Sequence, residues 1–160
     1  MGFIDRLGPE YGPLIDDLHF FGQHSTRLFP EATTDICALV ANVLADNWSD
    51  WTEIVDDPGG TTLSSKFATK SGHISAMVVE IASVADKIYV VEVAYGTPKV
   101  IVSRFRIQSE TNKLPTAESP RVRARHIPAG ETIYYRCMCE AANTPAESIE
   151  VHFRYFLHGE

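Results

Sequence analysis

The sequence predicts a mainly β protein: an antiparallel β-sandwich, jelly-roll-like, preceded by an N-terminal arm or short helical segment. From residue 47 onward, runs of β-branched and aromatic residues alternate with Gly- and Pro-containing turns. About seven such runs follow one another without intervening helical patterns, which is typical of antiparallel sandwiches and barrels. A chain of 160 residues is also long enough to bury one core. We therefore assign residues 1–46 to the arm and residues 47–160 to the sandwich.

The first 46 residues have a different composition, in which Pro and Gly breaks separate two stretches of helical periodicity. Apolar residues recur at helical spacing in residues 14–21 and again in residues 33–44, so each stretch predicts a short helix. Many aromatic residues lie on this frame. An arm that wraps a neighbouring subunit has this composition, and so does a lid folded onto its own core. The candidate partner-binding residues here are Phe3, Phe20, Phe21 and Phe29.

The first four predicted strands follow in order from residue 51. Residues 51–55 form a short strand that the Asp-Asp-Pro-Gly-Gly turn at 56–60 ends. Residues 73–82 alternate between small or apolar and polar side chains. Residues 87–95 are dense in Val, Ile and Tyr, which is typical of a well-buried strand. A Gly-Thr-Pro turn then leads to residues 99–107, which complete this group.

Three further strands are predicted in the last quarter of the chain, at residues 120–126, 131–140 and 147–157. The last has period two, so that one face is apolar from Ile149 to Leu157 and the other carries polar residues. Residues 120–126 place three like charges on one face: Arg121, Arg123 and Arg125.

This arginine ladder has three readings. A solvent-facing sheet edge uses basic residues to prevent edge-to-edge pairing. A partner contact would match the arginines with acidic groups, since residues 1–80 carry 12 acidic and 4 basic side chains. The third reading is an anionic glycan or a nucleic acid. We expect no nucleic-acid partner, because the net charge is −7 and phosphate contacts need a basic surface.

No catalytic or metal-binding motif stands out. Cys37, Cys137 and Cys139 lack Cys-x-x-Cys spacing, and we expect small buried side chains rather than ligands or nucleophiles. His19 and His24 are five residues apart, an awkward spacing for one helical face. Glycine-rich phosphate loops and nucleophile elbows are absent from the sequence. The predicted protein is therefore non-enzymatic, with no cofactor and no metal.

Two tryptophans precede or begin the first predicted strand. We expect Trp51 to anchor the core, because large rings at strand starts usually pack inward. Trp48 is less determined, and it is the candidate glycan-binding residue of an aromatic platform that also involves Tyr95, Tyr134 and Tyr135.

Three segments together resemble a group of small virion-associated β-sandwich proteins of tailed bacteriophages. They are the Trp-containing strand at 48–55, the central pair at 88–95 and 100–102, and the Ile-Pro-Ala-Gly turn at 127–130 with the strands that follow. The resemblance covers residues 47–159. It implies a structural or attachment role in a virion, as capsid decoration, neck, tail or receptor contact.

The predicted function is therefore that of a non-enzymatic virion structural protein, with a carbohydrate- or receptor-binding module on the virion as the alternative. Its partners would be other virion proteins and further copies of itself, with a trimer expected by analogy with β-sandwich virion proteins. No run of about 18 apolar residues predicts a membrane span. No secretory signal is visible, so we expect synthesis in the host cytoplasm and localisation in the virion.

Overall fold

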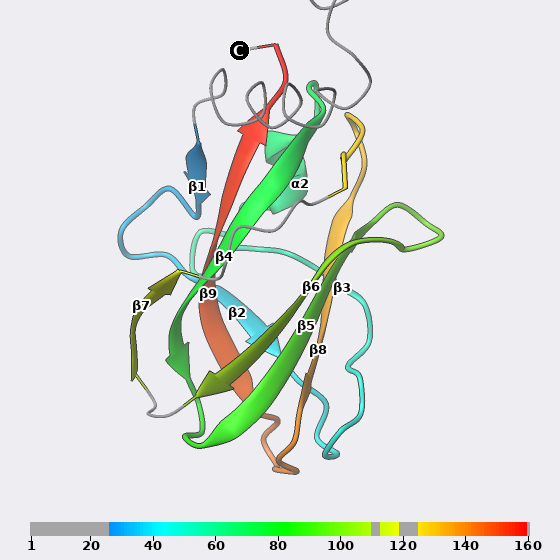
Figure 1. Cartoon of the computed structure of the whole chain (residues 1–160). Coiled ribbons are helices and arrows are strands. Elements are labelled where there is room, and N and C mark those ends of the chain that lie inside the picture. The colour runs from blue at the N-terminus through cyan, green and yellow to red at the C-terminus, as the bar shows by residue number, and fades with distance from the viewer. Residues whose placement is uncertain (1–25, 110–112, 119–124, 160) are drawn as a thin grey trace, which may run out of the picture.

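The computed structural model describes residues 26–109, 113–118 and 125–159, and these form a β-sandwich (Figure 1). The first antiparallel sheet contains β1 (Arg27–Phe29), β2 (Cys37–Val40), β4 (Gly72–Ala82), β7 (Lys113–Glu118) and β9 (Ser148–Leu157). The second contains β3 (Thr52–Glu53), β5 (Lys87–Tyr95), β6 (Val100–Ser109) and β8 (Ile133–Cys139). The predicted fold class, mainly β with antiparallel sheets, is confirmed.

The strand pairing is that of a jelly roll. Strand β2 pairs with β9, β3 with β8, β4 with β7, and β5 with β6, as in one long hairpin. Folding this hairpin over adds the β4–β9 and β5–β8 pairs, which assemble the two sheets. The resulting orders are β1/β2-β9-β4-β7 and β3-β8-β5-β6. This arrangement is the double-sheet jelly roll, in which consecutive strands repeatedly change sheets.

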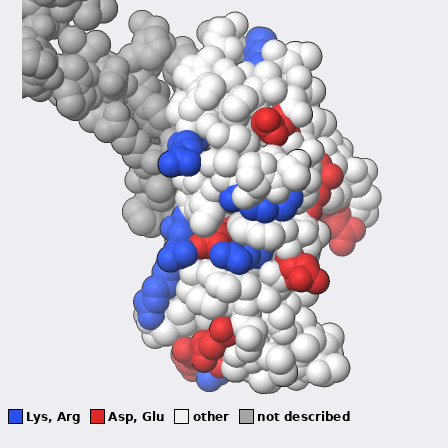
Figure 2. Space-filling view, turned by 90° about the vertical axis from the view of Figure 1, so that its right-hand side faces the viewer, with Lys and Arg blue, Asp and Glu red and all other residues white. Residues whose placement is uncertain are grey.

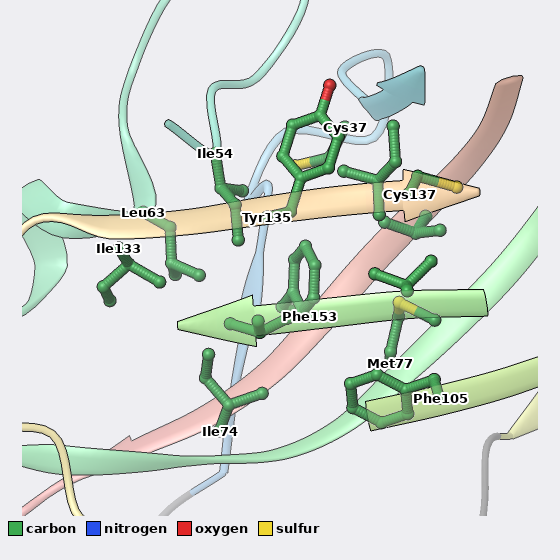
Figure 3. Packing of buried hydrophobic residues seen from close by; sticks show 14 of the residues in the cluster. Cys37, Ile54, Leu63, Ile74, Met77, Phe105, Ile133, Tyr135, Cys137 and Phe153 are labelled. Carbon is green, nitrogen blue, oxygen red and sulfur yellow. The ribbon is translucent and has the colours of Figure 1, made fainter. Parts of the chain in front are cut away.

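The core lies between the sheets and follows from the alternation of side chains along each strand (Figure 3). On β9, every second residue from Ile149 to Leu157 is buried, which confirms the predicted apolar face. The opposite face of β9 is more covered than predicted, since His152 and Phe156 are buried as well. Tyr135 on β8 connects the sheets, because its hydroxyl accepts a 3.1 Å hydrogen bond from the backbone N–H of Val40 on β2.

The predicted helix at residues 33–44 is wrong. The segment contains β2, whose residues alternate between buried and exposed and pair in register with β9. Apolar residues at 36, 39, 40 and 43 fit a helical period, but Cys37 and Leu39 also fit a strand of period two. Pairing with the central strand β9 buries both side chains fully, and this tertiary contact outweighs local periodicity. The other predicted helix, at 14–21, lies outside the described residues.

The sandwich begins before the predicted boundary at residue 47. Strands β1 and β2 pair with β9 in the same sheet, so residues 27–40 belong to the sandwich rather than to an arm. Phe29, predicted to bind a partner, is instead 1% exposed within the core of its own chain. A surface docking role for Phe29 is therefore wrong, because its ring already packs inside the sandwich.

Two further elements differ from the prediction. A short helix, α2 (Leu63–Lys66), lies between β3 and β4, where the sequence predicts only turns and strands; the Thr62 side chain caps its first turn. Strand β7 was not predicted, because its sequence contains a proline and few β-branched residues. As an edge strand it tolerates a proline that a central strand would not.

Candidate binding face on the second sheet

An ion-paired row of side chains crosses the outer face of the second sheet. Glu92 on β5 lies directly opposite Arg104 on β6 and Arg136 on β8, so all three project from the same face. The Nε of Arg104 donates to Glu92 Oε1 at 2.7 Å, and its Nη2 contacts the same oxygen. The Nε of Arg136 donates to Glu92 Oε2 at 2.7 Å, and its Nη2 lies 2.6 Å from that oxygen.

The carboxylate at the centre of this row is fully enclosed. Glu92 has no exposed side-chain surface, whereas the Arg104 side chain is 62% exposed and that of Arg136 is 26% exposed. A buried charge is tolerated only when hydrogen-bonded partners replace the lost water. Here two guanidinium groups do so, one on each carboxylate oxygen. The three charges sum to +1, and Arg104 is the more exposed of the two arginines.

Both tryptophans lie against Arg136. Its guanidinium carbon is 4.4 Å from the centroid of the Trp48 ring and 4.7 Å from that of Trp51, within the range of cation–π contacts. The segment that carries the two rings is held beside β8, since the Ser49 N–H donates to the Cys137 carbonyl at 2.9 Å. We call Arg104, Glu92, Arg136, Trp48 and Trp51 the Arg–Trp row.

The predicted roles of the aromatic residues are corrected in part. Trp51 is not a core anchor: it is half-buried on the outer face, as Trp48 is. Tyr134 shares this face, with the Lys99 ammonium 3.2 Å from its ring centroid. Tyr95 and Tyr135 point inward instead and pack with the core, so they contribute nothing to an outer aromatic platform.

Charge and apolar surface are mixed across this face of the molecule. Figure 2 looks at the side on which Figure 1 draws the second sheet and shows Lys and Arg side chains gathered across its middle, with acidic side chains among them. Ile101, on β6, is 42% exposed. Arg106 lies on the same side of β6 as Arg104 and is also exposed. The face therefore combines guanidinium groups with indole and aliphatic surface.

The cysteines are buried, as predicted. All three are free thiols with 0% exposure, and Cys137 and Cys139 share the inner face of β8. Burial raises the pKa of Cys37 and of Cys137 from the ordinary value of 9.0 to about 12, and it also raises the pKa of Cys139. The thiols are therefore protonated at neutral pH and inaccessible, which makes them unsuited to nucleophilic or redox chemistry.

Several predicted site residues lie outside the described residues: Phe3, Phe20, Phe21, Arg121 and Arg123. Of the arginine ladder, only Arg125 is described. It is exposed and lies outside any strand, and its backbone N–H donates to the Val102 carbonyl at 3.4 Å. The turn predicted at 56–60 is present, with Gly60 at a φ of +71°.

Sequence reasoning missed the Arg–Trp row. Its members are 12 and 32 residues apart along the strands, beyond any local spacing rule. The one signal was Glu92 itself, a lone acidic residue inside the apolar run at 87–95. A charge in a strand buried on both sides predicts a partner on the neighbouring strands.

Comparisons of the chain with protein-family models, with characterised proteins and with solved structures found no match. Among the described residues, no helix is long and apolar enough to cross a bilayer. In that same part of the chain, no three His, Cys, Asp or Glu side chains place their donor atoms together as metal ligands.

Proposed function

We propose that the chain is a non-enzymatic structural protein of a tailed-bacteriophage virion, a capsid decoration, neck or tail component that acts through protein–protein contacts. The virion assignment is supported by the resemblance of the three segments within residues 47–159. The jelly roll is compatible with it, because this fold recurs in viral capsid domains. The same fold also occurs in lectins and enzymes, so the fold alone does not indicate the function. A surface feature provides the further support.

That feature is the Arg–Trp row. Arg and Trp are the residue types most enriched at the energetic centres of protein interfaces. In this row the ion pairs with Glu92 and the contact between Arg136 and the rings already hold the side chains in place. A preorganised surface loses less side-chain entropy when a partner docks.

The chemistry of the row selects an acidic partner surface. Arg104 exposes 62% of its side chain while Glu92 neutralises only one of the two guanidinium groups. Carboxylates on another virion protein could pair with this charge, and so could those of a second copy, since the chain carries a net charge of −7. Complementary charge of this kind sets register and on-rate more than affinity. A homo-oligomer, with three copies expected, follows from the same proposal.

The proposal is tested on purified phage particles. Mass spectrometry should detect the chain in the particles, and the purified chain should cosediment with particles assembled without it. Trp48→Ala and Arg104→Ala should weaken cosedimentation, whereas Lys66→Ala should not, because Lys66 lies on α2 and pairs with Glu31 rather than with a member of the Arg–Trp row. Absence of the chain from particles would overturn the virion assignment. Equal cosedimentation of all variants would exclude the Arg–Trp row as the contact.

A carbohydrate- or receptor-binding module on the virion is the second candidate. The observation in its favour is the pair of half-buried indole rings on one outer face, since flat aromatic surfaces stack on sugar rings. A glycan array and a titration with the best sugar separate the two candidates. Saturable sugar binding that Trp48→Ala abolishes supports the module. Particle binding without any sugar binding supports the protein contact.

A further inference from the structure

Strand β6 forms one edge of the second sheet. In the strand order β3-β8-β5-β6, its only partner among the described strands is β5. It is ten residues long, whereas β3 at the opposite edge has two. A long edge strand presents a row of backbone N–H and C=O groups that another chain can bind. The edge of β6 is therefore a candidate site for the addition of a strand.

The hydrogen bonds of β5 identify the residues of β6 whose backbone faces outward. The N–H of Glu140, which follows β8, donates to the Ile88 carbonyl at 3.0 Å. Ile88 and every second residue after it on β5 thus bond toward β8, and the residues between them bond toward β6. These intervening residues lie opposite the odd-numbered residues of β6. The N–H and C=O groups of Arg104, Arg106 and Gln108 therefore point away from the sheet.

A hydrogen bond near the start of β6 agrees with this orientation. The Arg125 N–H donates to the Val102 carbonyl at 3.4 Å, so the outward side of β6 accepts a bond from another segment there. Further along, between Arg104 and Gln108, the outward backbone groups form no bond to another described residue. We call this stretch, residues 104–108, the open edge.

Two exposed arginines lie along the open edge. The Arg104 side chain is 62% exposed and Arg106 is also exposed, whereas Phe105 between them is buried in the core. A strand added to β6 would place its outer side chains about 4.5–5.5 Å from those of Arg104 and Arg106. Acidic side chains at every second position would pair with both arginines, and basic side chains would be repelled.

A second copy of β6 fits this edge poorly. A two-fold axis would pair the strand with itself in antiparallel orientation. In the registers centred on Arg104, on Phe105 or on Arg106, at least one arginine then lies directly opposite an arginine of the second copy. Like charges directly opposite each other destabilise a strand pair, which is how basic residues protect sheet edges from self-association. The open edge therefore selects a different chain, one that carries acidic residues.

We propose that the open edge binds an extended acidic segment of another protein by strand addition. The segment would become the fifth strand of a four-stranded sheet, with acidic side chains opposite Arg104 and Arg106. In this mode of recognition, main-chain hydrogen bonds provide affinity and alternate side chains provide specificity. The inference rests on the proposed function, in which an acidic surface of another virion protein docks on this sheet, and it adds how that partner is held.

Nuclear magnetic resonance on the purified full-length chain tests the proposal. The probe is the capped peptide Thr-Glu-Val-Glu-Val-Glu-Thr, an extended sequence with acidic side chains at alternate positions. When it binds, the amide protons of Arg104, Arg106 and Gln108 should exchange with solvent more slowly, because they gain hydrogen-bond acceptors. The same peptide with lysine in place of each glutamate should not bind.

Two N-methylated forms of the acidic peptide separate strand addition from charge attraction alone. In an antiparallel pair, the glutamates opposite the outward residues of β6 direct their N–H groups at β6, and the valines direct theirs away. Methylation of the glutamate nitrogens should therefore abolish binding, whereas methylation of the valine nitrogens should preserve it. Both forms carry the same charge.

Two variants of the chain test the open edge itself. Gln108→Pro removes one outward N–H but keeps both arginines, and an edge strand tolerates such a proline. Arg106→Glu places an acidic group where the arginine pairs with the peptide. Each should weaken binding of the acidic peptide at least about threefold. Lys66→Glu is the control, because it changes the net charge by the same amount as Arg106→Glu but lies on α2, and it should bind as the wild type does.

Failure of the acidic peptide to bind, or equal binding of its two N-methylated forms, would overturn the proposal. A wild-type dimer that Gln108→Pro dissociates would also overturn it, because a second copy would then occupy the open edge. None of these measurements uses phage particles. Failure here therefore leaves the virion assignment standing, and absence of the chain from particles would leave the peptide result standing.

Discussion

Replacing Arg136 with alanine should destabilise the fold strongly, because this side chain is the better shielded partner of a fully buried carboxylate. Arg136 provides both contacts to Glu92 Oε2 and packs against two indole rings, Trp48 and Trp51. After the substitution, Glu92 retains only Arg104, whose side chain is 62% exposed. The carboxylate would then be enclosed in the sheet with one oxygen unpaired.

Arg136→Ala should lower the free energy of unfolding by about 3–5 kcal/mol. Hydrogen bonds to a charged group contribute about 1.5–3 kcal/mol, and a buried charge left without its partner costs about 3–5 kcal/mol, lessened here because Arg104 remains. Two cation–π contacts add about 0.5–1 kcal/mol each. Arg104→Ala should cost less, about 1–2 kcal/mol, since water reaches much of this side chain. The total free energy of unfolding of a domain of this size is only about 5–15 kcal/mol.

Urea unfolding followed by far-ultraviolet circular dichroism measures these losses. Arg106→Ala is the control: Arg106 lies on the same side of β6 as Arg104, opposite Val90, and makes no ion pair with a described residue. It should change the unfolding free energy by less than about 0.5 kcal/mol. Adding Glu92→Gln to Arg136→Ala should recover part of the loss, because it removes the unpaired charge. Equal stabilities of Arg136→Ala and Arg106→Ala would refute the reasoning.

Three further predictions concern the core. Stability should fall as pH rises from about 9 to 12, because thiols ionise above 9.0 in the unfolded chain while Cys37 and Cys137 stay protonated to about 12 in the fold. Each of the two thiols then lowers the free energy of unfolding by about 1.4 kcal/mol per pH unit. An unchanged urea midpoint between pH 8 and pH 10.5 under reducing conditions would contradict this prediction. Tyr135→Phe should cost about 0.5–1.5 kcal/mol by removing the hydrogen bond to the Val40 N–H, with a urea midpoint shifted at constant slope. Gly72→Ala should lower the melting temperature sharply or prevent folding, because the new Cβ would collide with the Phe156 carbonyl oxygen on β9. A variant that melts at the wild-type temperature would show that the strands can separate without cost.

The strongest strands could be predicted from local sequence alone. The predicted limits of the strand at 87–95 agree with β5, because a dense run of β-branched and aromatic residues has few alternatives to a buried strand. The apolar face of β9 follows from alternation alone, since successive side chains point to opposite sides. The turns at 56–60 and 96–98 were predicted from Gly and Pro, and Gly60 and Gly96 have positive φ values.

Where the sequence pattern is weak, or fits both a helix and a strand, only tertiary contacts select the secondary structure. The segment around Cys37 and Leu39 fits a helix and a strand equally, and only its pairing with β9 selects the strand. Strand β7 has a poor β sequence, and its pairing with β4 defines it. Phe29 lies in the segment that the sequence assigns to the arm, but β1 pairs with β9 in the first sheet and its Phe29 ring is buried.

The Arg–Trp row depends on long-range strand register, which local sequence does not encode. Glu92, Arg104 and Arg136 become neighbours only because β5 pairs with β6 and β8 in one particular register. Strand alternation tells which side of a strand a residue occupies, but the hydrophobic packing of the whole sandwich determines which strands lie beside it.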